Sequence, residues 1–215
     1  MEKLKIKVCG MRDVENIRAI AALPIDYMGF IFYEKSPRNI TDWIDLKNLG
    51  LKKVGVFVNA ELNFVASKIS TFRLNAVQLH GSETPQYLQE LKIKNDELGM
   101  HDLEIWKAFS VDEHFDFEKT KPYEGLADFF LFDTKTSQHG GAGVKFDWSV
   151  LEKYNATTPF FLAGGITADD GVLIKNLKLR IRNLYGVDLN SRFELAPALK
   201  DVEKLRRFVA EIKEY

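Results

Sequence analysis

KVCGMRDVENI, residues 7–17, carries the end of a short apolar strand into a glycine turn and then into a helix that Asp13 can cap. The only cysteine of the chain, Cys9, ends the strand and Gly10 follows it. A free cysteine is usually a small buried hydrophobe. Here, however, strand, glycine-rich or polar turn and helix recur about eight times along the chain, so Cys9 belongs to a repeated pattern.

The repeated units predict eight parallel strands that are each followed by a helix. The expected strands are residues 4–8, 27–32, 53–58, 74–79, 104–109, 128–132, 159–163 and 183–187. We expect helices from Asp13, at 62–71 after Asn59 as a cap, from Pro85, more weakly from Asp112, from Thr167, and at 202–213. Eight such units can close without an exposed edge, so the sequence predicts an α/β fold, a TIM (β/α)8 barrel. An open doubly wound sheet is the alternative.

Length and composition favour a single domain, residues 1–215, because no linker divides the chain. The net charge of -1 gives no electrostatic reason to expect nucleic acid or an anionic membrane as a partner. One cysteine excludes an internal disulfide and fits a reducing compartment. The first residues lack an apolar stretch that could act as a signal peptide or membrane span, so we expect a cytoplasmic protein.

A closed barrel gathers the carboxyl ends of its strands at one mouth, where barrel enzymes carry their active sites. The residues that follow strands or end them are Cys9, Arg38, His80, Gly81, Asp133, Gly164, Gly165 and Asp188. A thiol and a carboxyl group that face each other there can act as base and acid on a small substrate without a metal. Taken alone, Asp133 is more simply explained as a helix cap or as an acid at the rim of the core.

Lys7 lies two residues before Cys9 and therefore shares its face of the strand, pointing into the barrel. A buried ammonium group needs a partner, and Asp133 and Asp188 are the candidates. A cation beside Cys9 would also favour the thiolate that a base requires.

The loops after the seventh and eighth strands, AGGI and VDLNS, are where barrels of this class bind phosphate. Glycine lets backbone amides approach an oxyanion, and a helix that starts at Asn190 and Ser191 would add amide donors. Arg38 follows Ser36 and Pro37, where its guanidinium can bind a carboxylate as a fork.

The long loop after the sixth strand contains GGAG, residues 140–143, which we interpret as a cover over the site or as a flexible surface loop. The four histidines show no metal-ligand spacing, and we expect no metal. They are His80, His101, His114 and His139.

Several motifs, in order along nearly the whole chain, resemble the phosphoribosylanthranilate isomerase family of tryptophan biosynthesis. They are KVCG (7–10), MGFIFYEKSPR (28–38), VGVFVN (54–59), VQLHGSE (77–83), GGAG (140–143), FLAGGI (161–166) and YGVDLNS (185–191). The resemblance implies a TIM barrel that isomerises N-(5'-phosphoribosyl)anthranilate to the 1-deoxyribulose 5-phosphate. This is a cofactor-independent Amadori rearrangement, which makes the enzyme an intramolecular oxidoreductase of the aldose-ketose isomerase type.

The resemblance also implies roles for single residues. Cys9 matches the general base and Asp133 the general acid. Arg38 matches the arginine associated with the anthranilate carboxylate. The family's phosphate site is matched here by Gly164, Gly165, Asp188, Asn190 and Ser191. The family's segment after the fourth strand is matched by His80 and Gly81.

Two segments depart from the family pattern. NSRFE, residues 190–194, stands where the family commonly has SSGVE, so Arg192 and Phe193 replace glycine and a smaller apolar residue. Val144 stands where many relatives carry lysine, with Lys145 displaced by one residue. The first change puts the glycine-built phosphate site in question, although an arginine could instead strengthen phosphate binding. The second puts the loop contacts to substrate in question.

Three alternatives remain at this stage. Another phosphosugar barrel enzyme, such as an indoleglycerol-phosphate synthase or a sugar-phosphate epimerase, shares the fold. A non-catalytic barrel that binds a phospholigand fits the altered segments. A cysteine hydrolase would need a histidine beside Cys9. Barrels of this type occur as monomers and as homodimers, and both states are open.

Overall fold

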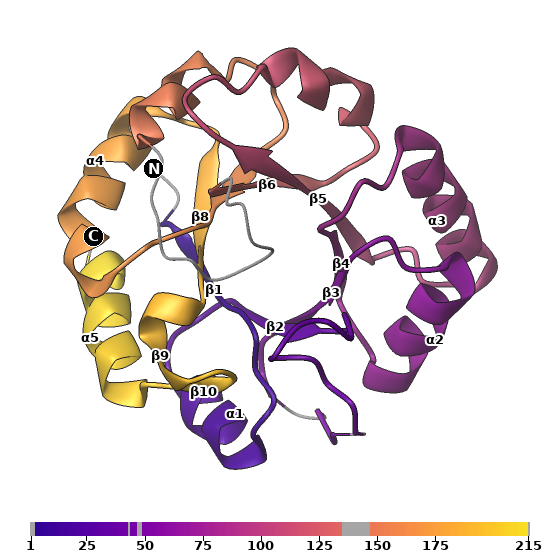
Figure 1. Cartoon of the computed structure of the whole chain (residues 1–215), viewed down its shortest axis with the longest axis horizontal. Coiled ribbons are helices and arrows are strands. Elements are labelled where there is room, and N and C mark those ends of the chain that lie inside the picture. The colour runs from indigo at the N-terminus through magenta and orange to yellow at the C-terminus, as the bar shows by residue number, and fades with distance from the viewer. Residues whose placement is uncertain (1–2, 43, 47–48, 135–146, 215) are drawn as a thin grey trace.

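The computed structural model describes residues 3–42, 44–46, 49–134 and 147–214. Eight parallel strands pair in sequence order, and β8 pairs with β1 to close the ring (Figure 1). The strands are β1 (Lys5–Val8), β2 (Tyr27–Ile31), β3 (Lys52–Phe57), β4 (Ala76–Leu79), β5 (Glu104–Val111), β6 (Phe129–Thr134), β7 (Phe160–Leu162) and β8 (Leu184–Leu189). The predicted TIM barrel is confirmed, and closure excludes the open sheet.

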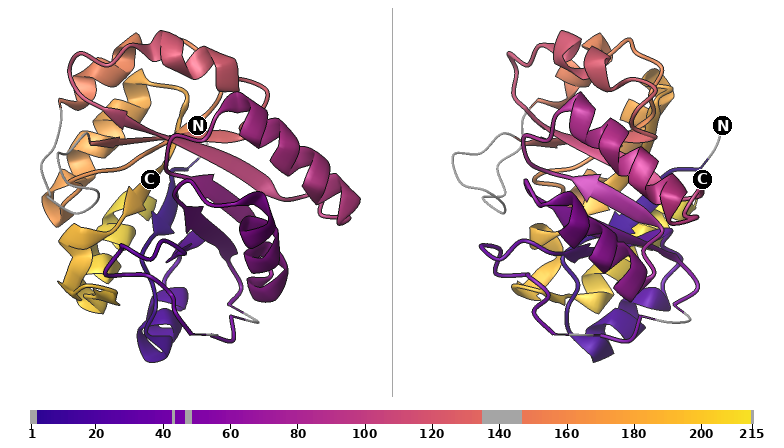
Figure 2. Two further views of the ribbon diagram at one scale, coloured as in Figure 1. Left: turned by 45° about the vertical axis from the view of Figure 1, so that its right-hand side comes forward. Right: turned by 90° about the vertical axis from the view of Figure 1, so that its right-hand side faces the viewer.

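The helices form a ring outside the strands (Figure 1). They are α1 (Val14–Ala21), α2 (Leu62–Phe72), α3 (Pro85–Glu97), α4 (Gly171–Arg180) and α5 (Val202–Lys213). Shorter 3-10 helices are η1 (Phe117–Tyr123), η2 (Trp148–Lys153), η3 (Ala168–Asp170) and η4 (Ser191–Phe193). Figure 2 shows α2 and α3 side by side along the barrel wall.

Helix starts follow local capping. The Asp13 carboxylate accepts a hydrogen bond from the Asn16 amide at 2.8 Å, as predicted. Asn59 is not the cap of α2, because that position is Glu61. Instead, Asn59 has a φ of 50° and its Oδ1 accepts a hydrogen bond from the Ser82 amide at 2.7 Å. It therefore joins the loops after β3 and β4.

The prediction of a helix from Asp112 is wrong. β5 continues to Val111, and the next helical segment is η1. Pro122 lies inside η1 and has no amide hydrogen, so an α-helix cannot run through this segment without losing a hydrogen bond.

A small hairpin that the sequence analysis did not predict follows η4. Its strands are β9 (Glu194–Ala196) and β10 (Leu199–Lys200). The Asn16 side chain on α1 donates to the Lys200 carbonyl at 2.9 Å and accepts from the Lys200 amide at 2.8 Å. A hairpin this short is not stable alone, so these bonds to α1 hold it in place.

The barrel interior is packed beneath the mouth by aromatic rings. Trp106 stacks on Phe161 with ring centroids 4.3 Å apart, and Tyr27 meets Trp106 edge-on at 5.0 Å. The Lys7 Nζ lies 5.9 Å from the centroid of the Trp106 ring. An aromatic layer therefore closes the bottom of the barrel, and a polar layer begins at Lys7.

Within the described part of the chain, no helix combines the length and apolar character that crossing a membrane requires.

Candidate active site

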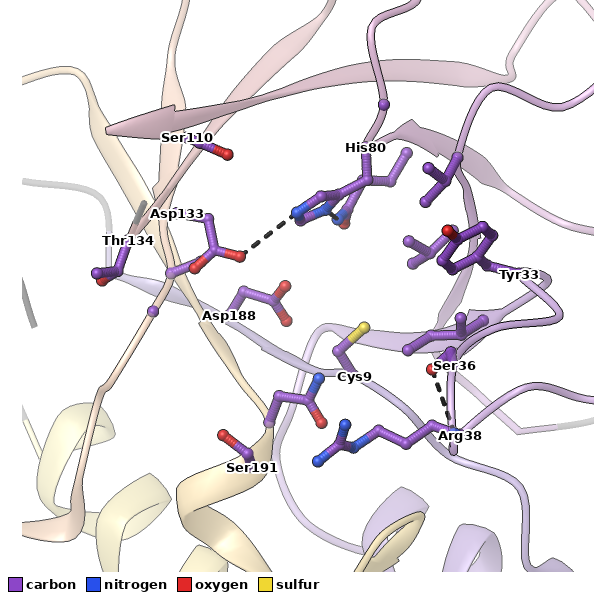
Figure 3. A pocket seen from close by; sticks show the side chains of 18 of the residues that line it. Cys9, Tyr33, Ser36, Arg38, His80, Ser110, Asp133, Thr134, Asp188 and Ser191 are labelled. Atoms are coloured by element: carbon purple, nitrogen blue, oxygen red, sulfur yellow. Dashed lines mark hydrogen bonds and ion pairs between the residues drawn. The ribbon is translucent and has the colours of Figure 1, made fainter. Parts of the chain in front are cut away.

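A cavity of about 460 Å³ lies at the carboxyl ends of the barrel strands (Figure 3). All the residues that the sequence analysis proposed for the site line it: Cys9, Arg38, His80, Gly81, Asp133, Gly164, Gly165, Asp188, Asn190 and Ser191. They come from the ends of β1, β2, β4, β6, β7 and β8, which only closure of the ring brings together.

Cys9 sits where β1 turns away from the barrel. Its amide donates to the Leu189 carbonyl at 2.9 Å, and Gly10 makes the turn with a φ of 77° that favours glycine. The thiol points into the cavity (Figure 3). A Cβ on Gly29 of the neighbouring β2 would lie 2.7 Å from the Cys9 Sγ and 3.1 Å from the Lys7 Cε. Gly29 therefore leaves the room that both side chains need.

Lys7 is fully buried and points into the barrel. Its Nζ donates to Asp188 Oδ2 and to Gln78 Oε1, both at 2.7 Å. Of the two candidate partners, Asp188 is therefore the one that neutralises Lys7.

The environment of Cys9 acts on its pKa in opposite directions. Burial raises the pKa of the thiol, and the positive charge of Lys7 lowers it by less, so the pKa of Cys9 lies above its ordinary value. Burial lowers the pKa of Lys7, but Asp188 and Cys9 together outweigh burial and raise it above its ordinary value. Lys7 remains charged, but it does not make the resting thiol a thiolate.

Asp133 lies at the end of β6 and faces His80. The distance between His80 Nε2 and Asp133 Oδ2 is 3.4 Å, and both side chains are partly exposed to the cavity (Figure 3). The other carboxylate oxygen, Oδ1, lies beside Gly164, where a Cβ would approach it to 2.6 Å. Gly164 also has a φ of 83°, so glycine meets two requirements at this position.

Arg38 is held by Glu194 from the hairpin, a residue that the sequence analysis missed. Arg38 Nε donates to Glu194 Oε1 at 2.9 Å and Nη2 donates to Oε2 at 2.6 Å. Lys200 Nζ donates to the same Glu194 Oε1 at 2.6 Å and to Asn190 Oδ1 at 2.7 Å. A guanidinium has five N–H groups, so the edge of Arg38 opposite Glu194 remains available to a ligand.

The glycine-rich end of the cavity joins the loops after β7 and β8. Gly164 and Gly165 both have positive φ, and η4 starts at Ser191. The expected helix start is thus a three-residue 3-10 helix. Arg192 lines the cavity here. Phe193 is instead buried and packs on Phe208 of α5, with ring centroids 5.1 Å apart. The larger residue at 193 is therefore accommodated by the core.

A buried ion pair fixes the loop that carries His80 and Gly81. Lys107 Nζ donates to Glu83 Oε2 at 3.0 Å and to the Gly81 carbonyl at 2.7 Å. The Gly81 amide in turn donates to Glu83 Oε2 at 2.9 Å. The sequence signal for this ion pair was Lys107, a lysine inside the apolar strand β5. Its partner Glu83 lies in the loop after β4, so the sequence alone did not reveal the pair.

The GGAG segment, with Val144, Lys145 and His139, lies outside the described residues. Within the residues that are described, no group of three or more His, Cys, Asp or Glu side chains could hold a metal ion.

A closed (β/α)8 barrel with a thiol and a carboxyl group across one cavity, and a glycine-rich end beside them, defines a barrel enzyme equipped for acid–base chemistry on a small anionic substrate. The family model described as N-(5'phosphoribosyl)anthranilate (PRA) isomerase matches residues 6–211. The chain belongs to this family.

Similar proteins agree with this assignment. A curated relative from Parabacteroides distasonis, described as N-(5'-phosphoribosyl)anthranilate isomerase, is 45% identical over 213 residues, covering 96% of this chain and 92% of the relative. The crystal structure of phosphoribosyl anthranilate isomerase from Thermotoga maritima superposes with a TM-score of 0.81 at 28% identity, covering 99% of this chain and 100% of that chain.

A further solved structure is phosphoribosyl anthranilate isomerase in complex with reduced 1-(o-carboxyphenylamino)-1-deoxyribulose 5-phosphate. It superposes with a TM-score of 0.75 at 25% identity and covers 99% of this chain and 100% of that chain.

Proposed function

We propose that this chain isomerises N-(5'-phosphoribosyl)anthranilate to 1-(2-carboxyphenylamino)-1-deoxyribulose 5-phosphate, a step of tryptophan biosynthesis. The observation that carries the proposal is that Cys9, directly after β1, and Asp133 on β6 line one cavity from different sides of the ring. A single sugar between them could receive a proton on one side and lose one on the other. Membership of the family supports the same reaction.

In this reaction Asp133 is the general acid and Cys9 the general base. Asp133 gives its proton to the ribose ring oxygen, the bond from that oxygen to C1 breaks, and an iminium forms. Cys9 reacts from its thiolate form, which is the minor form at neutral pH because burial raises the pKa of the thiol, and it becomes a thiol by removing the C2 proton. The enolamine then tautomerises to the ketone by gaining a proton at C1 and losing the hydroxyl proton at C2. C1 is reduced and C2 oxidised within one molecule, so the enzyme is an intramolecular oxidoreductase that needs no cofactor and no covalent intermediate.

Binding groups flank this pair. We assign the substrate phosphate to the end of the cavity formed by Gly164, Gly165, Asn190 and Ser191, where glycine gives an oxyanion close access to backbone amides. We assign the anthranilate carboxylate to the free edge of Arg38. In the described structure the buried Asp188 Oδ1 has no hydrogen-bond partner, so it is suited to accept a hydroxyl of the sugar.

His80 and Gly81 complete the proposed substrate-binding set at the end of β4. The substrate is thus a small molecule. The cytoplasmic location, the single-domain organisation and the choice between monomer and homodimer stay predictions.

The test is turnover of the purified chain with the aminophosphoribosyl substrate, followed by loss of anthranilate fluorescence. We expect Cys9→Ala and Asp133→Asn each to abolish turnover and to leave binding of a reduced product analogue nearly intact, because each removes only a proton-transfer group. Full activity in either variant would contradict its assigned role. Binding of the analogue by the wild-type chain without turnover would instead favour a non-catalytic barrel.

A further inference from the structure

A chain of polar contacts crosses the floor of the cavity and joins the surroundings of the proposed base to the proposed acid. Asp188 Oδ2 accepts from Lys7 Nζ at 2.7 Å, and Lys7 Nζ also donates to Gln78 Oε1 at 2.7 Å. Gln78 Nε2 lies 2.7 Å from His80 Nδ1, and His80 Nε2 lies 3.4 Å from Asp133 Oδ2 (Figure 3). The members come from β8, β1, β4 and β6.

Lys7 fixes which way the Gln78 amide faces. An ammonium group has three donors and no acceptor, so the Gln78 atom beside it must be the carbonyl oxygen. The amide nitrogen of Gln78 must then face His80. Gln78 is only 1% exposed, and its amide contacts Lys7 on one side and His80 on the other. These two contacts therefore determine the orientation of the amide.

The orientation of Gln78 in turn fixes the tautomer of His80. The amide NH2 group only donates, so His80 Nδ1 must offer it a lone pair. A neutral imidazole with an unprotonated Nδ1 carries its hydrogen on Nε2. Nε2 is the atom that faces Asp133 Oδ2, so the imidazole presents an N–H to the carboxyl group.

We propose that Gln78 is a positioning residue, which holds His80 in the Nε2–H tautomer so that His80 stabilises the carboxylate of Asp133 after proton donation. The inference rests on the proposed role of Asp133 as the acid. When the O–H bond of Asp133 breaks and the ring oxygen gains that proton, negative charge remains on the carboxylate. His80 faces Oδ2, which leaves Oδ1, beside Gly164, as the oxygen that holds the transferable proton.

No proton passes along this chain of contacts. Relay through Gln78 would convert its amide to an imidic acid, so the contacts orient groups and do not return a proton from Cys9 to Asp133.

The first test is the nitrogen NMR spectrum of the wild-type protein with labelled histidine, in which the two neutral tautomers give different shifts. The chain has four histidines, and His80→Gln identifies the signals of His80. We expect His80 to carry its hydrogen on Nε2. A spectrum of the Nδ1–H tautomer, or of an even mixture, overturns the proposal. This test does not depend on whether a Gln78 variant folds.

Two substitutions of Gln78 then test the consequence for catalysis. The carboxylate of Gln78→Glu accepts at both ends, so it should move the His80 hydrogen to Nδ1, and Gln78→Met should remove the preference. We expect kcat to fall roughly ten- to a hundredfold in both, with a much smaller change in KM, because only the alignment of the acid is disturbed. Unchanged His80 signals, or kcat close to wild type in folded variants, overturns the proposal.

Two controls separate positioning from stability. Gln86→Met makes the same change at an exposed glutamine of α3, whose side chain donates to Glu90, and should leave the His80 signals and kcat unchanged. In a His80→Gln background the new amide can donate to Asp133, and it has no tautomer for Gln78 to fix. Gln78→Met should therefore lower kcat far less in that background than in wild type. An equal loss in both backgrounds overturns the proposal.

The two readouts also separate this inference from the proposed function. A wild-type chain that does not turn over the aminophosphoribosyl substrate refutes the function. The nitrogen spectrum still decides the tautomer in that case.

Discussion

Cys9 can act as a base only as a thiolate, and its surroundings oppose that form more than they favour it. Burial raises the pKa of Cys9, and Lys7 lowers it by a smaller amount. The rate of alkylation of Cys9 should therefore rise with pH through a midpoint above the ordinary pKa of a cysteine thiol. Lys7→Met removes the stabilising cation, so it should move this midpoint further upward. Iodoacetamide labelling followed by mass spectrometry measures both midpoints.

The urea-unfolded chain is the reference and should titrate near the free cysteine value of about 8.5. Asp188 raises the pKa of Cys9, so a Lys7→Met/Asp188→Asn double variant should show a smaller upward shift than Lys7→Met alone. An unchanged midpoint in Lys7→Met would show that the lysine serves the fold and not the thiol.

The proposed site residues could be chosen from the sequence because position at a strand end is a local property. Once eight units close into a ring, Cys9 and Asp133 must reach the same mouth. Gln78 and Glu194 were missed because their roles depend on partners that lie elsewhere in the sequence. Gln78 matters through Lys7 across the barrel, and neither residue type nor spacing reveals that contact.

The β9–β10 hairpin contributes to the site through the carboxylate of Glu194. Burial raises the pKa of Glu194, but Arg38 and Lys200 outweigh burial and lower it. A carboxylate whose pKa is lower in the folded state stabilises the fold at neutral pH, and this contribution disappears as the pH falls below 4.5 through the folded value. Glu194→Gln should therefore destabilise the protein by roughly 3 kcal/mol at neutral pH, since it leaves two cations facing each other.

Urea unfolding at pH 7 and at pH 4 measures this effect, and the difference between wild type and Glu194→Gln should narrow at the lower pH. Glu203→Gln on α5 is the matched control, because its pair with Arg206 is exposed and should contribute less than about 1 kcal/mol. A pH-independent difference would contradict the assignment.

Elements with strong periodicity were predicted well. α5 has the expected bounds, Val202–Lys213, because its apolar stripe and its Asp201 cap are both local. The segment after β5 has a proline and a cluster of aromatic residues in place of a helical stripe, and it folds as η1. The hairpin is too short to show alternation, and contacts with distant residues stabilise it, namely the bonds of Lys200 to Asn16 and the ion pair of Glu194 with Arg38.

At the scale of the whole molecule, the aromatic layer inside the barrel should decide stability. Trp106 is fully buried between rings of other strands. Trp106→Ala should therefore cost about 3 to 5 kcal/mol in the free energy of unfolding, because it leaves a cavity that the closed ring cannot collapse to fill. Circular dichroism and tryptophan fluorescence during urea unfolding measure the loss.

The matched control is Phe64→Ala on α2, which truncates an aromatic ring that is 43% exposed and should cost much less. If residues 1–215 form one domain, both probes should follow a single transition. Separate transitions, or equal losses in the two variants, would show that the barrel interior does not govern its stability.

The proposed acid and base belong to different halves of the ring. β1 to β4 supply Cys9, Lys7, Gln78 and His80, whereas β5 to β8 supply Asp133, Asp188 and the glycine pair. A four-strand fragment of either half would carry one proton-transfer group without its counterpart. Recovery of turnover on mixing two such fragments would thus report assembly of the complete barrel. Turnover can therefore serve as an assay for how the barrel assembles.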